Sequence, residues 1–110
     1  MDANDYFQRG IQQQNAGDYA SAISDLEKAA ELAPESFEVW WALGKTSLLM
    51  GNRIEQRHAY RKANFFKMKA ADAYEKAASL NPVEPRAGKA LEIAQTLRTA
   101  SQERRKLGML

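Results

Sequence analysis

The sequence predicts an all-α protein built from helical hairpins, and three observations support this prediction. Between the turn signals, the helix-favouring residues Ala, Leu, Glu, Lys and Gln dominate. The three prolines of the 110-residue chain stand at positions 34, 82 and 85, which leaves long stretches without a helix breaker. Apolar residues recur at the three- and four-residue spacing of one helical face. We expect a single domain over residues 1–110, because the chain is too short for two independent cores.

The first two expected helices form a hairpin. Residues 4–15 are predicted to be the first helix, and Gly17-Asp18 marks a tight turn. Residues 19–32 are predicted to be the second helix, and Pro34 ends it. The apolar face of this second helix consists of Ala22, Ile23, Leu26, Ala29 and Ala30.

The third expected helix covers residues 36–50. Ser36 suits its N-cap, and Glu38 lies in the first turn, where the helix dipole favours an acid. Gly51-Asn52 then repeats the turn signal of glycine followed by a polar residue. The order of helix, turn, helix and proline therefore begins again.

The segment 53–81 contains neither proline nor glycine. We expect one long helix over residues 53–80, about 42 Å in length. A break near Asn64, which would create an additional hairpin, is the alternative. The sequence AYRKA at residues 59–63 recurs 14 residues later as AYEKA, so this segment resembles a partial duplication.

The last expected helix covers residues 84–107 and closes the stack as a cap. Pro85 suits its first turn. Its apolar stripe, with polar residues off it, consists of Ala87, Ala90, Leu91, Ala94 and Leu97.

A repeat of 34 residues underlies this order, since Tyr6 and Trp40, and likewise Gly17 and Gly51, are that far apart. The sequence here resembles the tetratricopeptide repeat (TPR) family, a helix–turn–helix repeat with a shared pattern of aromatic, small and proline positions. Segment 3–36 matches the pattern at Tyr6, Gly10, Ala22, Leu26 and Pro34, and segment 37–82 matches it at Trp40, Leu43, Gly44, Ala70, Tyr74 and Pro82. The departures are Arg9, Gln13, Ser47 and a 14-residue insertion in the second segment.

The resemblance implies two repeats, about 3–36 and 37–82, followed by the capping helix 84–107, as a fragment of an α-solenoid. It also implies a non-catalytic protein–protein interaction module that holds a peptide or helix in the groove formed by the first helix of each hairpin. The ligand-facing positions that the resemblance implies are Phe7, Ile11, Gln14, Trp41, Lys45 and Leu48. We expect Trp41 to anchor the partner and Lys45 to meet an acidic group. Packing of Trp41 and Phe7 against the cap or another copy is the alternative.

Self-association is a second expectation, in which the chain acts as a scaffold. A helix over 53–80 would project beyond its own hairpin and expose apolar groups on more than one face. Ile54, Phe65 and Met68 are the residues expected to meet a second copy in a homodimer, with exchange of a hairpin as one route.

Charge is unevenly distributed along the chain, whose pI is near 9.0. Residues 1–36 hold two basic and seven acidic residues, a net charge of −5, whereas residues 53–69 hold six basic residues and one acid, a net charge of +5. The acidic third of one copy could meet the basic stripe 53–69 of another. Nucleic-acid binding through this basic stripe is a third and less favoured hypothesis, since most of its aromatic residues are expected in the core.

The sequence favours no enzyme class. Cysteine is absent and His58 is the sole histidine, which argues against a metal site, and no nucleophile stands with a matching base. The glycines are isolated, so no phosphate-binding loop is expected. We therefore predict neither a cofactor nor a metal. The sequence also lacks an apolar stretch long enough to cross a membrane and a signal-peptide pattern, so we expect a cytoplasmic protein without a membrane partner.

Overall fold

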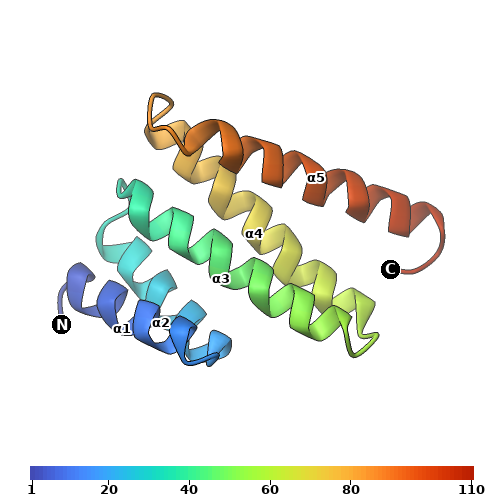
Figure 1. Ribbon diagram of the computed structural model, residues 1–110, viewed down its shortest axis with the longest axis horizontal. Helices are drawn as coiled ribbons and strands as arrows, with labels where there is room; N and C mark the ends of the chain where they lie inside the picture. Colours follow the sequence, from blue (N-terminus) through green and yellow to red (C-terminus); the bar gives the residue numbers. More distant parts are fainter.

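The computed structural model describes residues 1–110 as five α-helices joined by short connections, with overall extents of 43 × 30 × 19 Å (Figure 1). Each helix packs against its neighbours in the chain, so that the helices alternate in direction along a curved stack. The prediction of an all-α protein made of helical hairpins is confirmed. The helices are α1 (Ala3–Asn15), α2 (Tyr19–Leu32), α3 (Phe37–Glu55), α4 (Tyr60–Leu80) and α5 (Ala87–Lys106).

Local capping signals set the ends of the first hairpin. The backbone N–H of Asp5 donates to the Asp2 carboxylate at 2.9 Å and the N–H of Asp2 donates to the Asp5 carboxylate at 3.0 Å, which forms a capping box at the start of α1. Gly17 adopts a left-handed φ of 80° in the turn, and the Asp18 carboxylate accepts a bond from the N–H of Ser21 at 3.3 Å. The expected bounds of α1 and α2 therefore match the structure closely.

Arg9, the first departure from the TPR pattern, forms an ion pair inside this hairpin. Its guanidinium donates to both oxygens of the Asp25 carboxylate, at 2.6 and 2.9 Å. Asp25 is only 8% exposed, and the hydrogen bond from Arg9 holds the pKa of its carboxyl below the ordinary value. A bidentate pair therefore joins α1 to α2 at the position where the pattern has a leucine.

The single helix expected over residues 53–80 is wrong, and so is the alternative break near Asn64. Helix α3 continues through Gly51 and Asn52 to Glu55, and residues 56–59 form the turn into α4. His58 adopts a left-handed φ of 61° in this turn, so it is an exposed turn residue rather than a helical one. The turn forms without the glycine or proline that would have announced it.

The insertion is shared between both helices of the second hairpin. Helix α3 has 19 residues against 13 in α1, and α4 has 21 against 14 in α2. Two antiparallel helices bury each other only along the length that they share, so lengthening both by about two turns keeps the hairpin packed. One helix of 28 residues would have left about half of its apolar face uncovered, which is the physical reason why the chain folds back earlier.

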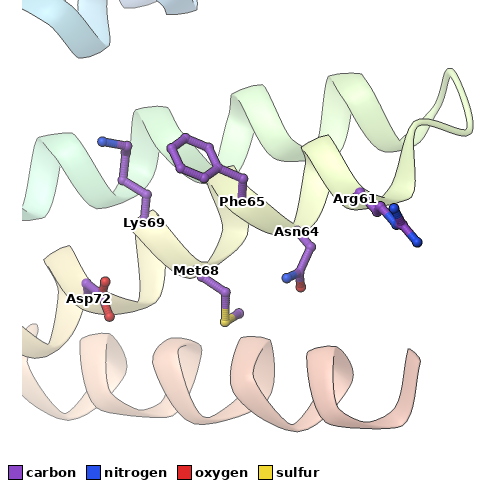
Figure 2. A pocket seen from close by; sticks show the side chains of 6 residues that line it. All are labelled: Arg61, Asn64, Phe65, Met68, Lys69 and Asp72. Carbon is purple, nitrogen blue, oxygen red and sulfur yellow. The ribbon is translucent and has the colours of Figure 1, made fainter. Parts of the chain in front are cut away.

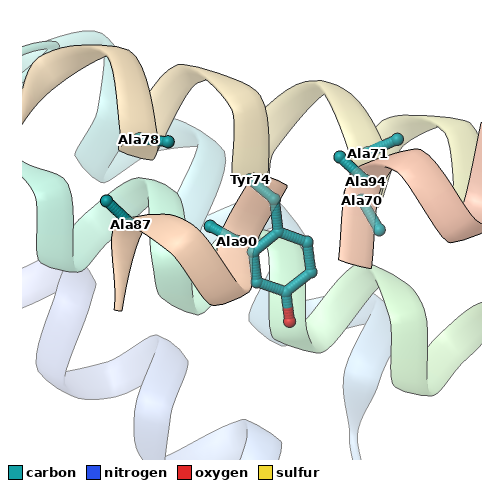
Figure 3. Packing of buried hydrophobic residues seen from close by; sticks show 7 residues of the cluster. All are labelled: Ala70, Ala71, Tyr74, Ala78, Ala87, Ala90 and Ala94. Atoms are coloured by element: carbon teal, nitrogen blue, oxygen red, sulfur yellow. The ribbon is translucent and has the colours of Figure 1, made fainter. Parts of the chain in front are cut away.

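The core is rich in alanine. Tyr74 of α4 belongs to a cluster of small residues of α4 and α5, and Figure 3 shows the alanines of this cluster along the two facing helices. Small side chains allow α4 and α5 to approach closely, while the large Tyr74 ring lies against Gly44 and Trp41 of α3. The members of this cluster are Ala70, Ala71, Tyr74, Ala78, Ala87, Ala90 and Ala94.

Candidate protein-interaction surface

The three candidate groove residues of α1 are partly buried. Phe7 and Ile11 pack against the core cluster that contains Leu26. The side-chain oxygen of Gln14 accepts a hydrogen bond from the hydroxyl of Thr46 on α3 at 2.9 Å. These residues therefore bind α1 to the rest of the fold and present only part of their surface to solvent.

Trp41 of α3 is held on several sides. Its ring meets the edge of Tyr74 with a centroid separation of 5.2 Å, and it stacks on Phe37 at 6.0 Å. The guanidinium of Arg86 lies 5.3 Å from the Trp41 ring centroid, a cation–π contact made from the connection that leads into α5. Trp41 is thus a half-buried residue that joins α3, α4 and the start of α5.

Arg86 is itself oriented by two carboxylates. It forms ion pairs with Glu84, at 2.9 Å, and with Glu38 of α3. The hydrogen bonds with Glu84 and then Glu38 raise the pKa of the Arg86 guanidinium above its ordinary value. The two carboxylates thus hold the guanidinium where it lies over the rings of Phe37 and Trp41.

The other two candidate groove residues of α3 differ from each other. Leu48 is partly buried against the Tyr74 cluster. Lys45 is exposed and lies within 4.0 Å of no carboxylate, since none of the ion pairs in the structure includes it. Among the six positions, Lys45 is the only exposed one, whereas the other five are partly buried.

The three residues expected to meet a second copy are not equivalent. Ile54 is 6% exposed within the α3–α4 hairpin, because the helix that was expected to carry it outward does not exist. Met68 is half-buried, and Figure 2 shows it pointing toward α5. Phe65 is 60% exposed and points away from α5 (Figure 2). Only Phe65 keeps most of its ring at the surface.

Half of the basic stripe is occupied by contacts within the protein. Arg53 donates to the carbonyl oxygen of Gly17 at 2.7 Å and covers the ring of Tyr19, with its guanidinium 4.1 Å from the ring centroid. Lys67 pairs with Glu55, and Lys69 donates to Glu27 at 2.8 Å. The cations of this stripe that are exposed and lack an ion-pair partner are Arg57, Arg61 and Lys62.

Lys67 was not recognised from the sequence as a buried residue. It is 8% exposed, and its ammonium reaches Glu55, which also accepts from Arg104 of α5 at 3.0 Å. Burial alone would raise the pKa of the Glu55 carboxyl, but the hydrogen bonds and charges of Lys67 and Arg104 hold it below the ordinary value. This network joins α3, α4 and α5. The residue that could have signalled it is Gly51, which the sequence pattern predicts to lie in a turn and whose missing side chain makes room for the Lys67 stem.

Two hollows occur on the side formed by α2 and α4. The first lies along α4 beside the exposed ring of Phe65 (Figure 2) and is lined by Arg61, Asn64, Phe65, Met68, Lys69 and Asp72. The second lies between α2 and α3 and is lined by Glu27, Ala30, Glu31, Trp40 and Leu43. Neither is an enclosed cavity, so neither surrounds a small molecule on all sides.

The described side chains include no group of three or more His, Cys, Asp or Glu residues that could hold a metal ion. None of the five helices combines the length and the hydropathy needed to cross a membrane.

The comparison with known families matches residues 3–36 to the tetratricopeptide repeat. This span contains α1, α2 and the connection to α3. Neither the curated proteins nor the solved structures yielded a significant match. The small-residue contact of the first hairpin, Gly10 against Leu26, has a counterpart in the second, where Gly44 lies against the ring of Tyr74. Residues 3–36 therefore match the tetratricopeptide repeat, and the five helices of the chain are consistent with TPR-like hairpins.

Proposed function

We propose that this protein is a non-catalytic interaction module that binds a peptide or helix of another protein along α1 and α3. The TPR match supports a role in protein–protein interaction. The observation that carries the finer proposal is Lys45, an exposed cation without an ion-pair partner among the partly buried residues Trp41 and Leu48. A cation in such a setting is available to an acidic group of the partner.

The proposed groove combines this charge with apolar surface. Phe7 and Ile11 of α1 and Trp41 of α3 are each partly exposed, so each offers apolar area to a ligand. Contacts with Tyr74 and Arg86 already hold the Trp41 ring in place, which reduces the conformational entropy that binding would cost. The partner that fits is an amphipathic segment with one acidic residue.

In domain terms, we propose one TPR-like unit over residues 1–110. Repeat 1 covers about 3–36, repeat 2 covers about 37–82 with its 14 extra residues, and the cap covers about 84–107. The network of Glu55, Lys67 and Arg104 supports a single unit, because it joins the cap to the lengthened end of the second hairpin.

A displayed library of random peptides tests the proposal with the full chain as the target. Affinities of the selected peptides are then measured by fluorescence anisotropy for the wild type and for Lys45→Glu. We expect selection of acidic, amphipathic peptides and a loss of about tenfold in affinity for Lys45→Glu, because reversing the charge replaces an attraction by a repulsion.

Lys76→Glu is the matched control, since Lys76 is also exposed and without an ion-pair partner but lies on α4. It should leave peptide binding unchanged. Equal losses of affinity for both variants would indicate a non-specific charge effect. Peptides that bind the wild type and both variants with equal affinity would show that the binding surface lies elsewhere.

Self-association remains a second candidate function, and one specific observation favours it. Phe65 exposes 60% of its surface in a chain whose other phenylalanines are at least partly buried. An exposed ring of this size, flanked by cations, is characteristic of a protein contact surface.

A further inference from the structure

The exposed ring of Phe65 stands between two cations of α4, Arg61 and Lys69, of which Arg61 has no ion-pair partner. Phe65 meets Phe66 edge to face at 5.1 Å, and the ammonium of Lys69 lies 5.6 Å from its ring centroid. One turn before it, Arg61 is exposed and unpaired. Phe65 therefore projects as an apolar knob with a basic border.

The hollow between α2 and α3 has the opposite character. Its floor contains the buried residues Ala30 and Leu43, and Trp40 forms a wall whose indole N–H donates to the carbonyl oxygen of Pro34 at 2.8 Å. Glu27 and Glu31, both exposed, border it; within the chain Glu27 pairs with Lys69, and Glu31 pairs with Lys28 at 3.3 Å in a solvent-exposed contact of the weak surface kind. The hollow therefore has an apolar floor and an acidic rim.

Knob and hollow adjoin on the same side of the molecule. The Lys69 ammonium, one helical turn after Phe65, donates to Glu27, which borders the hollow, at 2.8 Å. A two-fold axis placed between two copies and passing over this ion pair would bring each knob opposite the other copy's hollow. The apolar ring of each copy would then face the apolar floor of the other copy's hollow, and the cations beside the ring would face the acids that border the hollow.

We propose that two copies of this chain form a symmetric dimer in which Phe65 of each copy enters the Trp40 hollow of the other, with Arg61 facing Glu31. A second copy fits better than a nucleic acid, because the acidic rim would repel phosphates. A dimer formed through the α3–α4 turns would be less favourable, because it would bring the unpaired Arg57 of one copy, with its neighbouring cations, close to the same cations of the other copy. No helix exchange is required, and Ile54 stays buried.

This inference is independent of the peptide groove, because Phe65 lies on α4 whereas the groove is formed by α1 and α3. Failure of either proposal therefore leaves the other standing. Sedimentation and light scattering of the full chain over a concentration series test the dimer. We expect a dimeric mass for the wild type, and self-association weakened about tenfold or more in Phe65→Ser, because the knob loses its apolar ring.

Val83→Ser is the control for Phe65→Ser. Val83 is an apolar residue that is 89% exposed in the connection before α5, so its replacement should leave dimerisation unchanged. Circular dichroism should show the same helix content for both variants. A wild type that remains monomeric at every concentration, or a Phe65→Ser variant that still dimerises as the wild type does, would overturn the proposal.

A charge exchange provides the sharper test of which residues meet. Arg61→Glu and Glu31→Arg should each weaken the dimer, because each places like charges opposite one another, and the double variant should restore it. Absence of restoration would overturn the assigned pairing. Binding of a generic single-stranded oligonucleotide by a monomeric wild type, lost in Arg61→Glu, would assign the surface to nucleic acid instead and reject the dimer.

Discussion

A Cβ atom on Gly51 would lie 2.9 Å from Cγ of Lys67, much as a Cβ atom on Gly10 would lie 2.8 Å from Cγ of Leu26. At both contacts a helix crosses its hairpin partner at a glycine. The second hairpin contains this contact twice, since Gly44 lies against the Tyr74 ring with a corresponding distance of 3.0 Å. Seven residues separate the two contacts on each helix, so the lengthened hairpin repeats its packing after about two turns.

The first prediction concerns this crossing point. Gly51→Val should destabilise the protein by about 1–3 kcal/mol, because the added side chain would meet Lys67 Cγ and the carbonyl oxygen of Ala63. Gly88→Ala is the control, since no atom lies within 4 Å of a Cβ there and alanine favours the helix by about 1 kcal/mol. Urea denaturation should show opposite shifts for the two variants. An unchanged midpoint for Gly51→Val would mean that α3 and α4 do not approach closely at this point.

The second prediction concerns the start of α4. Ala59 has φ −88° and ψ 72°, the same angles as Asp18 at the start of α2, but it offers no side chain to cap the helix. Ala59→Asp should therefore stabilise the protein by about 1 kcal/mol, and Asp18→Ala should cost a similar amount. Thermal melting of both variants tests this. A loss of stability in Ala59→Asp would contradict the turn at residues 56–59.

The third prediction is the pH dependence that Glu55 contributes. Its carboxyl has a folded pKa below the ordinary 4.5, so the folded protein binds fewer protons than the unfolded chain as the solution becomes acidic. The stabilisation from Glu55 is therefore complete above pH 4.5 and is lost as the pH falls through the folded pKa. Glu55→Gln should accordingly show a shallower loss of stability in acid than the wild type.

Glu103→Gln serves as the control for Glu55→Gln, since Glu103 is an exposed acid whose ion pair with Lys106 has a distance of 3.6 Å. Denaturant unfolding across the acid range should give Glu103→Gln a dependence of the unfolding free energy on pH that is close to that of the wild type. Parallel profiles for the wild type and Glu55→Gln would show that the Lys67 and Arg104 contacts do not stabilise the charged carboxyl.

The fourth prediction separates packing from ligand binding at Trp41. Trp41→Ala should cost about 2–3 kcal/mol of stability even without a ligand, because the ring packs on Tyr74 and Phe37 and under Arg86. Val83→Ala, which shortens a side chain that is 89% exposed, should cost less than about 0.5 kcal/mol. Equal stability of Trp41→Ala and wild type in urea denaturation would mean that the Trp41 ring is free to serve the ligand alone.

The first hairpin and the helical character of the whole chain could be predicted from local sequence. Gly17, Asp18 and Pro34 mark the ends of their helices by conformational preferences that act within a few residues. Ser36 caps α3 as expected, with its hydroxyl accepting from the N–H of Val39 at 3.3 Å. The match of residues 3–36 to the tetratricopeptide repeat agrees with the resemblance found in the same segment.

Local sequence did not reveal how the 14 extra residues are arranged. No glycine or proline announces the turn at residues 56–59, and Gly51-Asn52 resembles a turn but lies inside α3. Only pairing in three dimensions decides this point, because α3 and α4 must have matching lengths to cover each other.

The candidate site shows the same division between sequence and tertiary structure. The repeat pattern placed Trp41 and Lys45 on α3. It could not show that Tyr74 and Arg86 contact the Trp41 ring, or that Lys45 has no ion-pair partner. From the sequence, Lys67 is one cation of the basic stripe 53–69. In the structure it is buried, because its stem lies against Gly51 and its ammonium pairs with Glu55. Sequence by itself determined the helical character of the chain and the bounds of the first hairpin, because backbone preferences and periodicity act along the chain. Tertiary structure decided which faces of the helices are covered, because burial and charge pairing depend on residues that are distant in the chain.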